Sequence, residues 1–232
     1  MEDRKHTSSH YEKELQEIKD ELIYLGALTE KSIHTAMQSL TQRNSDLARE
    51  VIVNDDEIDK LDSLLEEKSI RVLALRQPTA IDLRFITTAI KVTGHLERIG
   101  DMAVNIAEKA VLLNELPKLK PYIDLPHMAE LVNEMIENSL NAFIREDLEL
   151  ARKVRQQEQM VDDLNDQIFR ELLTFMMEDS KAIHRAIFIM QVSKNLERIA
   201  DHAQGIADMV TYMVTGESVR HKKPEENGEE PA

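Results

Sequence analysis

The sequence predicts an all-α protein made of two tandem three-helix bundles, six long helices in total, related by an internal duplication. Its composition is typical of a helical protein with a core: 42% of the residues are hydrophobic, 31% are charged, and glycine and proline occur six times each. Apolar residues recur at helical spacing over long stretches. In addition, the hexapeptide Leu-Glu-Arg-Ile-Gly-Asp at residues 96–101 returns as Leu-Glu-Arg-Ile-Ala-Asp at residues 196–201.

The duplication extends well beyond this motif. Downstream of it, residues 103–107 resemble residues 203–207, and upstream of it residues 47–61 align with residues 150–164. The spacing between the two copies shortens from 103 to 100 residues along the way. The copies therefore differ by a few residues in the connection before the third helix, and each copy is expected to be one unit of three helices.

The first unit is expected over residues 9–115, with helices over residues 9–42, 45–75 and 79–114. The polar residues 1–8 are expected to be a disordered N-terminus. Asn44 is a typical N-cap residue for the second helix. Pro78 then ends that helix, because proline cannot donate the backbone hydrogen bond that a helix interior needs.

A linker is expected at residues 116–126, where Pro117 and Pro121 interrupt the helical pattern. The second unit is expected over residues 127–215, with helices over residues 127–145, 147–177 and 178–214. Asp147 is a typical N-cap residue for the fifth helix. Residues 216–232 are expected to be a disordered acidic tail, because they hold too few apolar side chains to form a core.

The net charge and the residue types restrict the classes of function that are expected for this chain. The net charge of −15 disfavours nucleic acids and anionic membrane surfaces, so a cation or a protein with a basic patch is the expected partner. The chain has no cysteine, which excludes disulfides, thiolate metal sites and thiol nucleophiles. A polar N-terminus and the lack of an apolar run of about 20 residues favour a cytoplasmic protein without a signal peptide or membrane span.

Each unit carries two pairs of carboxylates spaced four residues apart, which places both members of a pair on one face of a helix. The pairs are Asp55 with Asp59, Glu97 with Asp101, Glu158 with Asp162, and Glu197 with Asp201. Within a unit, the two pairs lie at similar distances from the turn that joins their helices, so they are expected to face each other. Like charges at this spacing destabilise a helix by about 0.2–0.5 kcal/mol. A bound cation would offset that cost, and oxygen ligands favour iron, manganese, magnesium or calcium, with zinc also possible.

A plainer interpretation of these acids stays open. The chain has 44 acidic residues, and many pairs at the same spacing, such as Asp62 with Glu66, are interpreted as solvated helix faces. Arg98 and Arg198 could also neutralise the motif carboxylates without a metal. Repetition at equivalent positions, and the apolar stripe that Glu97 shares, favour metal binding.

An enzyme is the second alternative, in the form of a metal-dependent enzyme that uses the carboxylate clusters. A ferritin-like di-iron site requires a histidine three residues after a glutamate, where this chain has Gly100 and Ala200. His95 and His202 flank the motifs without repeating and are interpreted as incidental residues rather than ligands. No nucleotide-binding loop, nucleophile elbow or zinc-protease motif occurs, so the chain is not expected to be an enzyme.

The duplicated bundles, the acidic pairs and the sequence Leu-Glu-Arg-Ile-Gly-Asp-Met-Ala-x-Asn-Ile-Ala-Glu from residue 96 resemble the PhoU family over about residues 9–215. The resemblance implies a non-enzymatic regulator of phosphate uptake and phosphate-starvation signalling, peripherally associated with membrane complexes. It implies that the protein contacts the ATPase subunit of the phosphate ABC transporter and a membrane sensor histidine kinase. The protein would hold this kinase inactive when phosphate is plentiful. A homodimer is also expected.

The same resemblance assigns metal clusters to the eight motif carboxylates. The second copy departs from the glycine form of the motif, with Ala200 in place of Gly100 and His202 in place of Met102. A small residue is kept in both copies, so a close approach of the helices is expected in both. Equal occupancy of the two sites by metal does not follow from this.

Overall fold

The computed structural model describes residues 2–217, with side chains from residue 10 onward. This part of the chain is all helical and confirms the predicted fold class. The expected acidic tail lies outside the described residues from residue 218 on. None of the described helices is long and apolar enough to cross a membrane. The elements are α1 (Glu2–Thr41), α2 (Ser45–Arg76), α3 (Ala80–Glu115), α4 (Asp124–Arg145), α5 (Leu148–Glu178), the short 3₁₀ helix η1 (Ser180–Ala182) and α6 (Ile183–Thr215).

Side chains cap the helices where the sequence predicts it. The Asn44 side chain accepts a hydrogen bond from the backbone N–H of Asp46 at the start of α2, at 3.0 Å. Asp147 accepts two such bonds, at 2.9 and 3.1 Å, at the start of α5. These bonds satisfy N–H groups that have no partner within the helix.

Three boundaries differ from the prediction. Helix α6 begins at Ile183, after the 3₁₀ helix η1, rather than at residue 178. Helix α1 already begins at Glu2, because residues 1–8 contain no proline or glycine that would break it, so the expected disordered segment at 1–8 is wrong for residues 2–8. Helix α4 begins at Asp124 and includes Pro126. Proline is tolerated in the first turn of a helix, where its missing N–H has no partner in any case. The linker is accordingly shorter than residues 116–126.

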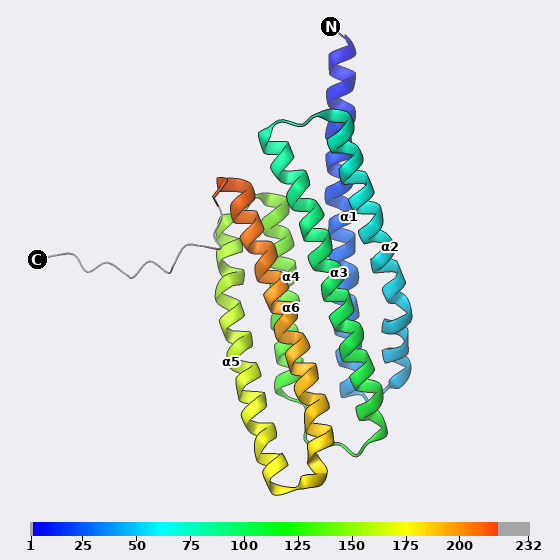
Figure 1. Cartoon of the computed structure of the whole chain (residues 1–232), viewed down its shortest axis with the longest axis vertical. Coiled ribbons are helices and arrows are strands. Elements are labelled where there is room, and N and C mark those ends of the chain that lie inside the picture. Colours follow the sequence, from blue (N-terminus) through cyan, green and yellow to red (C-terminus); the bar gives the residue numbers. More distant parts are fainter. Residues whose placement is uncertain (1, 218–232) are drawn as a thin grey trace, which may run out of the picture.

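The two units lie side by side with their long axes together (Figure 1). Helices α3 and α6 form the middle of the molecule, α2 and α5 flank them on opposite sides, and α1 packs against α4 behind. The α2–α3 connection lies at one end of the molecule and the α5–α6 connection at the other end. The duplicated units are therefore related by an approximate two-fold rotation.

The two units share one hydrophobic core. The rings of Phe85 in α3 and Phe143 in α4 stack with their centroids 5.2 Å apart. Gly26 of α1 packs against Leu140 of α4, where an added Cβ would lie 2.1 Å from the Cδ1 atom of Leu140. Dense packing of this kind resists relative movement of the elements, so the units form one body.

Candidate functional site

The first carboxylate cluster lies between α2 and α3. Asp55 and Asp59 project from α2, and Glu97 and Asp101 project from α3. Burial, together with the charges of Asp59 and Asp101, raises the pKa of Asp55 to about 6. Burial and the charge of Asp101 also raise the pKa of Glu97, with a further contribution from Asp59. The two predicted pairs therefore interact across the helix–helix contact.

Gly100 sets the distance between these two helices. A Cβ atom added to Gly100 would lie 3.1 Å from Asp55 Oδ1 and 3.1 Å from Ile58 Cδ1, both on α2. Because an ordinary van der Waals contact is about 3.5–4.0 Å, glycine permits a closer approach than any other residue here. In the second unit the same place is taken by Ala200, which is 1% exposed.

Asp62 also belongs to the first cluster, which the sequence analysis did not predict. Burial and the charges of Glu66 and Asp59 raise the pKa of Asp62. Asp62 in turn contributes to the raised pKa of Glu97 on α3. Asp62 is half-buried, so it is not a fully solvated residue of the helix face. The available signal was its position seven residues after Asp55, which places it two helical turns along the same face.

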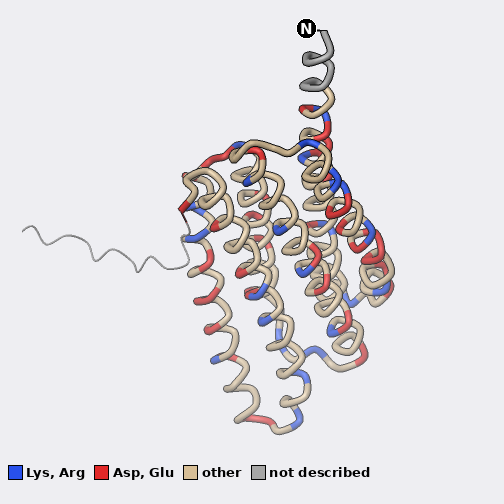
Figure 2. The backbone as a smooth tube through the Cα atoms, turned by 45° about the horizontal axis from the view of Figure 1, so that its top comes forward, with Lys and Arg blue, Asp and Glu red and all other residues tan. Residues whose placement is uncertain are grey.

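The second carboxylate cluster has the same construction between α5 and α6. Glu158 and Asp162 project from α5, and Glu197 and Asp201 project from α6. Burial raises the pKa of Glu158, and Asp162, Asp201 and Glu197 raise it further. The counterpart of Asp62 is Asn165, whose amide oxygen accepts a hydrogen bond from Ser193 at 2.5 Å. Figure 2 shows that acidic residues recur along both flanking helices, α2 and α5.

The two clusters differ in their positive neighbours. In the first, Arg98 lies 3.4 Å from Glu97 Oε2 and 3.2 Å from Asp101 Oδ2. In the second, the Lys194 ammonium lies 2.5 Å from Glu197 Oε2, and both Lys194 and Arg198 lower the pKa of Asp201 against the larger effect of burial. The first cluster therefore combines one more carboxylate with fewer cations, and it is the more negative of the two.

The chemistry of these side chains suits a hard cation, because carboxylate oxygens are the ligands that magnesium, manganese, calcium and oxidised iron prefer. Among the residues with described side chains, 10–217, no three His, Asp or Glu side chains are arranged so that they could already hold a metal ion. A cation would have to draw carboxylates from two helices together and compete with Arg98 or Lys194 for them. Metal binding at the eight predicted residues stays a prediction.

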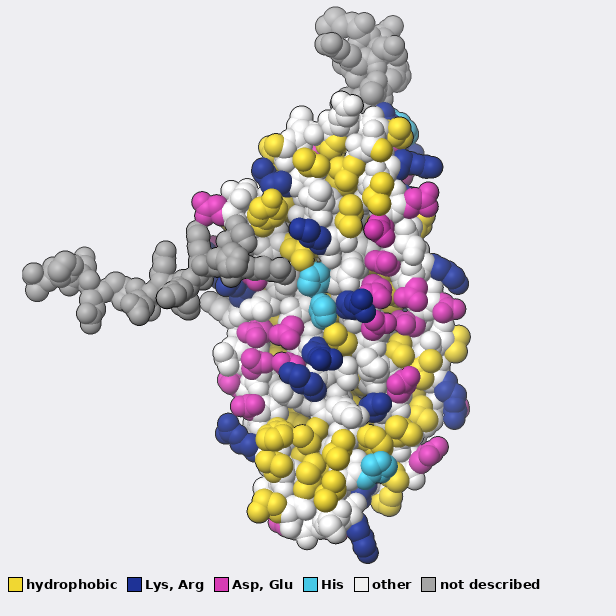
Figure 3. All heavy atoms as spheres, viewed as in Figure 1, with side chains coloured by type: hydrophobic (Ala, Val, Ile, Leu, Met, Phe, Trp, Pro, Cys, Tyr) yellow, Lys and Arg dark blue, Asp and Glu magenta, His cyan; other side chains and the backbone are white. Residues whose placement is uncertain are grey.

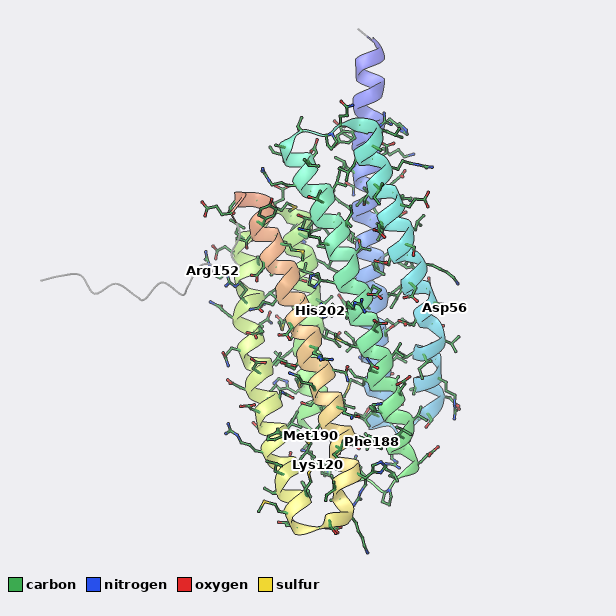
Figure 4. All side chains as sticks on the ribbon, viewed as in Figure 1. Asp56, Lys120, Arg152, Phe188, Met190 and His202 are labelled. Carbon is green, nitrogen blue, oxygen red and sulfur yellow. The ribbon has the colours of Figure 1, made fainter. Side chains whose placement is uncertain are left out.

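His95 and His202 meet at the seam between the two units. Their Nδ1 atoms are 2.9 Å apart, and their rings are in an edge-on arrangement with centroids 5.0 Å apart. Gly205 makes room for this pair, since a Cβ atom there would lie 2.7 Å from His95 Cε1. Figure 4 shows His202 midway along α6, on the side that faces α3.

This contact was not predicted from the sequence. The repeat aligns His95 with Asn195 and His202 with Met102, so each histidine looked like an isolated exception. The two residues lie on different helices that cross at this point, and the repeat alone does not say which positions of α3 and α6 face each other. The pair lines a cavity of about 480 Å³ together with Met102, Arg198 and Asp208.

Comparison with known families identifies both units. The family model described as PhoU domain matches the chain twice, over residues 22–110 and 125–210. The chain is 44% identical over 217 residues to the phosphate-specific transport system accessory protein PhoU homolog of Aquifex aeolicus, covering 94% of this chain and 98% of that protein. It is 39% identical to the protein of the same name from Pseudomonas aeruginosa, covering 93% and 90%.

Solved structures agree with this assignment. The crystal structure of PhoU from Pseudomonas aeruginosa superposes with a TM-score of 0.85 at 38% identity, over 89% of this chain and 100% of that one. The phosphate transport system regulatory protein PhoU from Streptococcus pneumoniae gives a TM-score of 0.83 at 28% identity, over 90% and 99%. Both units, their order and nearly the full length are matched, and the chain belongs to the PhoU family.

Proposed function

We propose that this protein is an accessory regulator of phosphate-specific transport that acts through protein contacts rather than through turnover of a substrate. The observation that carries this proposal is the near full-length match to proteins named phosphate-specific transport system accessory protein PhoU homolog. The duplicated carboxylate motif, present at equivalent places in both units, supports it as well. A regulator needs defined surfaces, and two rigidly packed bundles supply them.

The proposed partners are the ATPase subunit of a phosphate ABC transporter and the cytoplasmic part of a membrane sensor histidine kinase. When phosphate is plentiful, the protein would hold the kinase in its inactive state and restrain uptake. The net charge of −15 favours partners with basic patches, because complementary charge speeds encounter and excludes acidic competitors. A homodimer is part of the proposal.

The carboxylate clusters are proposed to bind divalent or trivalent cations. In the first unit Asp55, Asp59, Glu97 and Asp101 would hold the ion, with Asp62 beside them, and in the second unit Glu158, Asp162, Glu197 and Asp201 would do so. A bound cation neutralises carboxylates that burial and mutual repulsion now disfavour in their charged form. The role proposed for it is structural: it ties α2 to α3 and α5 to α6.

A genetic test addresses the regulatory role directly. In a strain that lacks this gene, a reporter for phosphate starvation should become active even in high phosphate, and the wild-type gene should restore repression. Purified protein should bind the ATPase subunit and the kinase domain in calorimetry. Normal repression in the deleted strain, together with no binding to either partner, would contradict the proposal.

The same material tests the enzyme alternative. The protein loaded with manganese or iron is incubated with a panel of phosphate esters, and inorganic phosphate release is followed. Under the proposal no turnover above that of the free ion is expected. Turnover that disappears in the variant Glu97→Ala with Asp101→Ala would instead assign a metal-dependent enzyme.

A further inference from the structure

Two histidines from different units meet at the seam between α3 and α6, and their separation is that of two ligands on one metal ion. The Nδ1 atoms of His95 and His202 are 2.9 Å apart, so one ring donates a hydrogen bond to the other. Two imidazole nitrogens bound to one ion at about 2.0–2.1 Å lie about 2.8–3.4 Å apart when the ligand angle is between about 90° and 109°. The two nitrogen atoms therefore already stand at a distance that a shared ion can bridge.

The histidine pair is accessible from solvent. Both side chains are half-buried, and both line the cavity of about 480 Å³ described above. Figure 3 shows histidine side chains at the surface in the middle of this face, and Figure 4 places His202 there. An ion from solvent can enter this cavity, and water molecules in it can complete the coordination of that ion.

The internal repeat shows that the fold does not need a histidine pair at the seam. In the other copy, Asn195 aligns with His95 and Met102 aligns with His202. Asn195 donates its side-chain hydrogen bond to the backbone oxygen of Gln191 on its own helix, at 2.7 Å. The equivalent positions are therefore filled by residues that do not form a pair of nitrogen ligands, and the histidines are a departure that packing does not require.

Gly205 is a third departure at the same place. The first copy has Asn105 at the aligned position. A Cβ atom on Gly205 would lie 2.7 Å from Cε1 and 3.3 Å from Nδ1 of His95, closer than an ordinary van der Waals contact of about 3.5–4.0 Å. The glycine thus leaves room for the ring whose Nδ1 faces the second histidine. Three differences between the copies converge on one contact, which points to a function located at the seam.

The charges of the cavity wall permit a cation. Among the residues that line the cavity, Arg198 is opposed by two carboxylates, Asp201 and Asp208. Arg98, on the α3 side, lies 3.4 and 3.2 Å from two carboxylates of its own helix. Asp208 also lies 3.4 Å from Arg155 on α5, an ion pair that is partly exposed and therefore weak. Because Asp201 belongs to the second carboxylate cluster, Asp208 is the oxygen ligand that this wall can offer.

We propose that His95 and His202 bind a transition-metal ion, Ni²⁺, Zn²⁺ or Cu²⁺, through their Nδ1 atoms. The ion takes the place of the proton between the two nitrogens, and the ring that held this proton carries it on Nε2 instead, so both rings stay neutral. Within residues 10–217, no three His, Asp or Glu side chains are already arranged to hold a metal. The remaining coordination positions are therefore filled by water, or by Asp208 after its side chain turns toward the ion.

This site differs from the carboxylate clusters in its position and in the metal it prefers. Imidazole nitrogen suits nickel, zinc and copper, whereas sites built from carboxylates alone suit magnesium, manganese and calcium. Each carboxylate cluster lies within one unit, whereas the histidine pair joins α3 of the first unit to α6 of the second. The inference goes beyond the regulatory function proposed above, and it holds whether or not the clusters bind metal.

Calorimetric titration of the full-length protein with Ni²⁺ tests the site, in millimolar magnesium that competes for the carboxylate clusters. The variant His95→Asn with His202→Met carries the other copy's residues at both positions, and its melting curve without metal verifies that it folds. The matched control His34→Asn with His127→Met removes two exposed histidines from other places. Pulsed EPR with Cu²⁺ as the probe counts the imidazole rings bound to the ion.

Under the proposal, the wild type and the control bind one nickel ion per chain at the pair, and the variant His95→Asn with His202→Met binds it at least tenfold more weakly. Copper should show two coordinated imidazoles in the wild type and in the control. No saturable nickel binding, equal affinity in the variant, or a copper signal with fewer than two imidazoles would overturn the proposal. Nickel binding that survives this exchange but is lost in Glu158→Ala with Asp162→Ala would assign the ion to the second carboxylate cluster and would also overturn it.

Discussion

Gly100 of α3 lies so close to Asp55 of α2 that a Cβ atom on the glycine would sit 3.1 Å from the Asp55 carboxylate. The smallest side chain thus stands beside the carboxylate whose pKa is raised to about 6 by burial and by its acidic neighbours. Close packing of α2 on α3 is what brings acids of both helices into mutual range. The energetic consequence is repulsion within the apo protein, which a cation would relieve.

The two clusters are expected to differ in cation affinity. The first has an extra carboxylate, Asp62, where the second has Asn165, and it lacks a lysine, because Gly94 stands where the second has Lys194. Manganese should therefore bind the first cluster more tightly. Transferring the second unit's residues, Asp62→Asn with Gly94→Lys, should weaken that site about tenfold, or about 1.4 kcal/mol. Calorimetric titration measures this, and equal affinities before and after the exchange would contradict the electrostatic explanation.

The variant Glu97→Ala with Asp101→Ala separates repulsion from metal binding. Without metal it should be as stable as the wild type or slightly more stable, because like charges have been removed. With metal at one hundred times its dissociation constant, the wild type should gain about 2.7 kcal/mol from binding at one site, a gain that the variant loses at the first cluster. Melting curves with and without manganese check this. An identical shift in both proteins would argue against a site at these residues.

A substitution at Gly26 tests how tightly the two units pack against each other, through its effect on the stability of the protein. Gly26→Ala directs a methyl group to within 2.1 Å of Leu140 Cδ1, in the buried contact of α1 with α4. Overpacking costs about 1–3 kcal/mol, which the better helix propensity of alanine offsets by up to about 1 kcal/mol, so a net loss of stability is expected. Gly94→Ala is the matched control: nothing lies within 4 Å of its added Cβ, so it should stabilise by about 0.5–1 kcal/mol. Urea unfolding measures both, and equal effects would contradict the packing shown.

Glu30 at the α1–α4 contact gives a pH-dependent prediction. Burial, and then the charge of Glu137, raise the pKa of Glu30 from its ordinary 4.5 to about 7. Between these values the folded state binds more protons than the unfolded state, so this residue makes stability fall as the pH rises from 4.5 to 7. Glu30→Gln should therefore be neutral near pH 4.5 and stabilising by about 1–3 kcal/mol at pH 8. Urea unfolding at the two pH values provides the test, and a pH-independent difference would count against it.

Much of the fold was predictable because its signals are local. Helical spacing of apolar residues, the caps at Asn44 and Asp147, and the repeat between residues 96–101 and 196–201 fix six helices in two units. The start of α1 was missed because an N-terminus without a helix breaker gives no clear boundary. The start of α4 was misplaced because Pro126 was interpreted as the boundary of the helix, although proline is accepted within the first turn.

The site was predictable only in part. Facing carboxylates followed from spacing on two antiparallel helices, but Asp62 was hidden among many similar acids. The contact between His95 and His202 depends on how α3 crosses α6. Such features arise from packing between distant segments, and one sequence with its internal repeat does not determine them.

Elemental analysis is the measurement that tests metal binding at the carboxylate clusters most directly. The protein is purified without chelators or metal-affinity columns, beside a variant in which all eight predicted carboxylates are replaced by alanine. The account predicts bound metal in the wild type and none in the variant, which would also name the ion. A wild-type protein that holds no metal, even after incubation with iron, manganese, magnesium or zinc, would contradict it and leave the clusters as carboxylates balanced by Arg98 and Lys194.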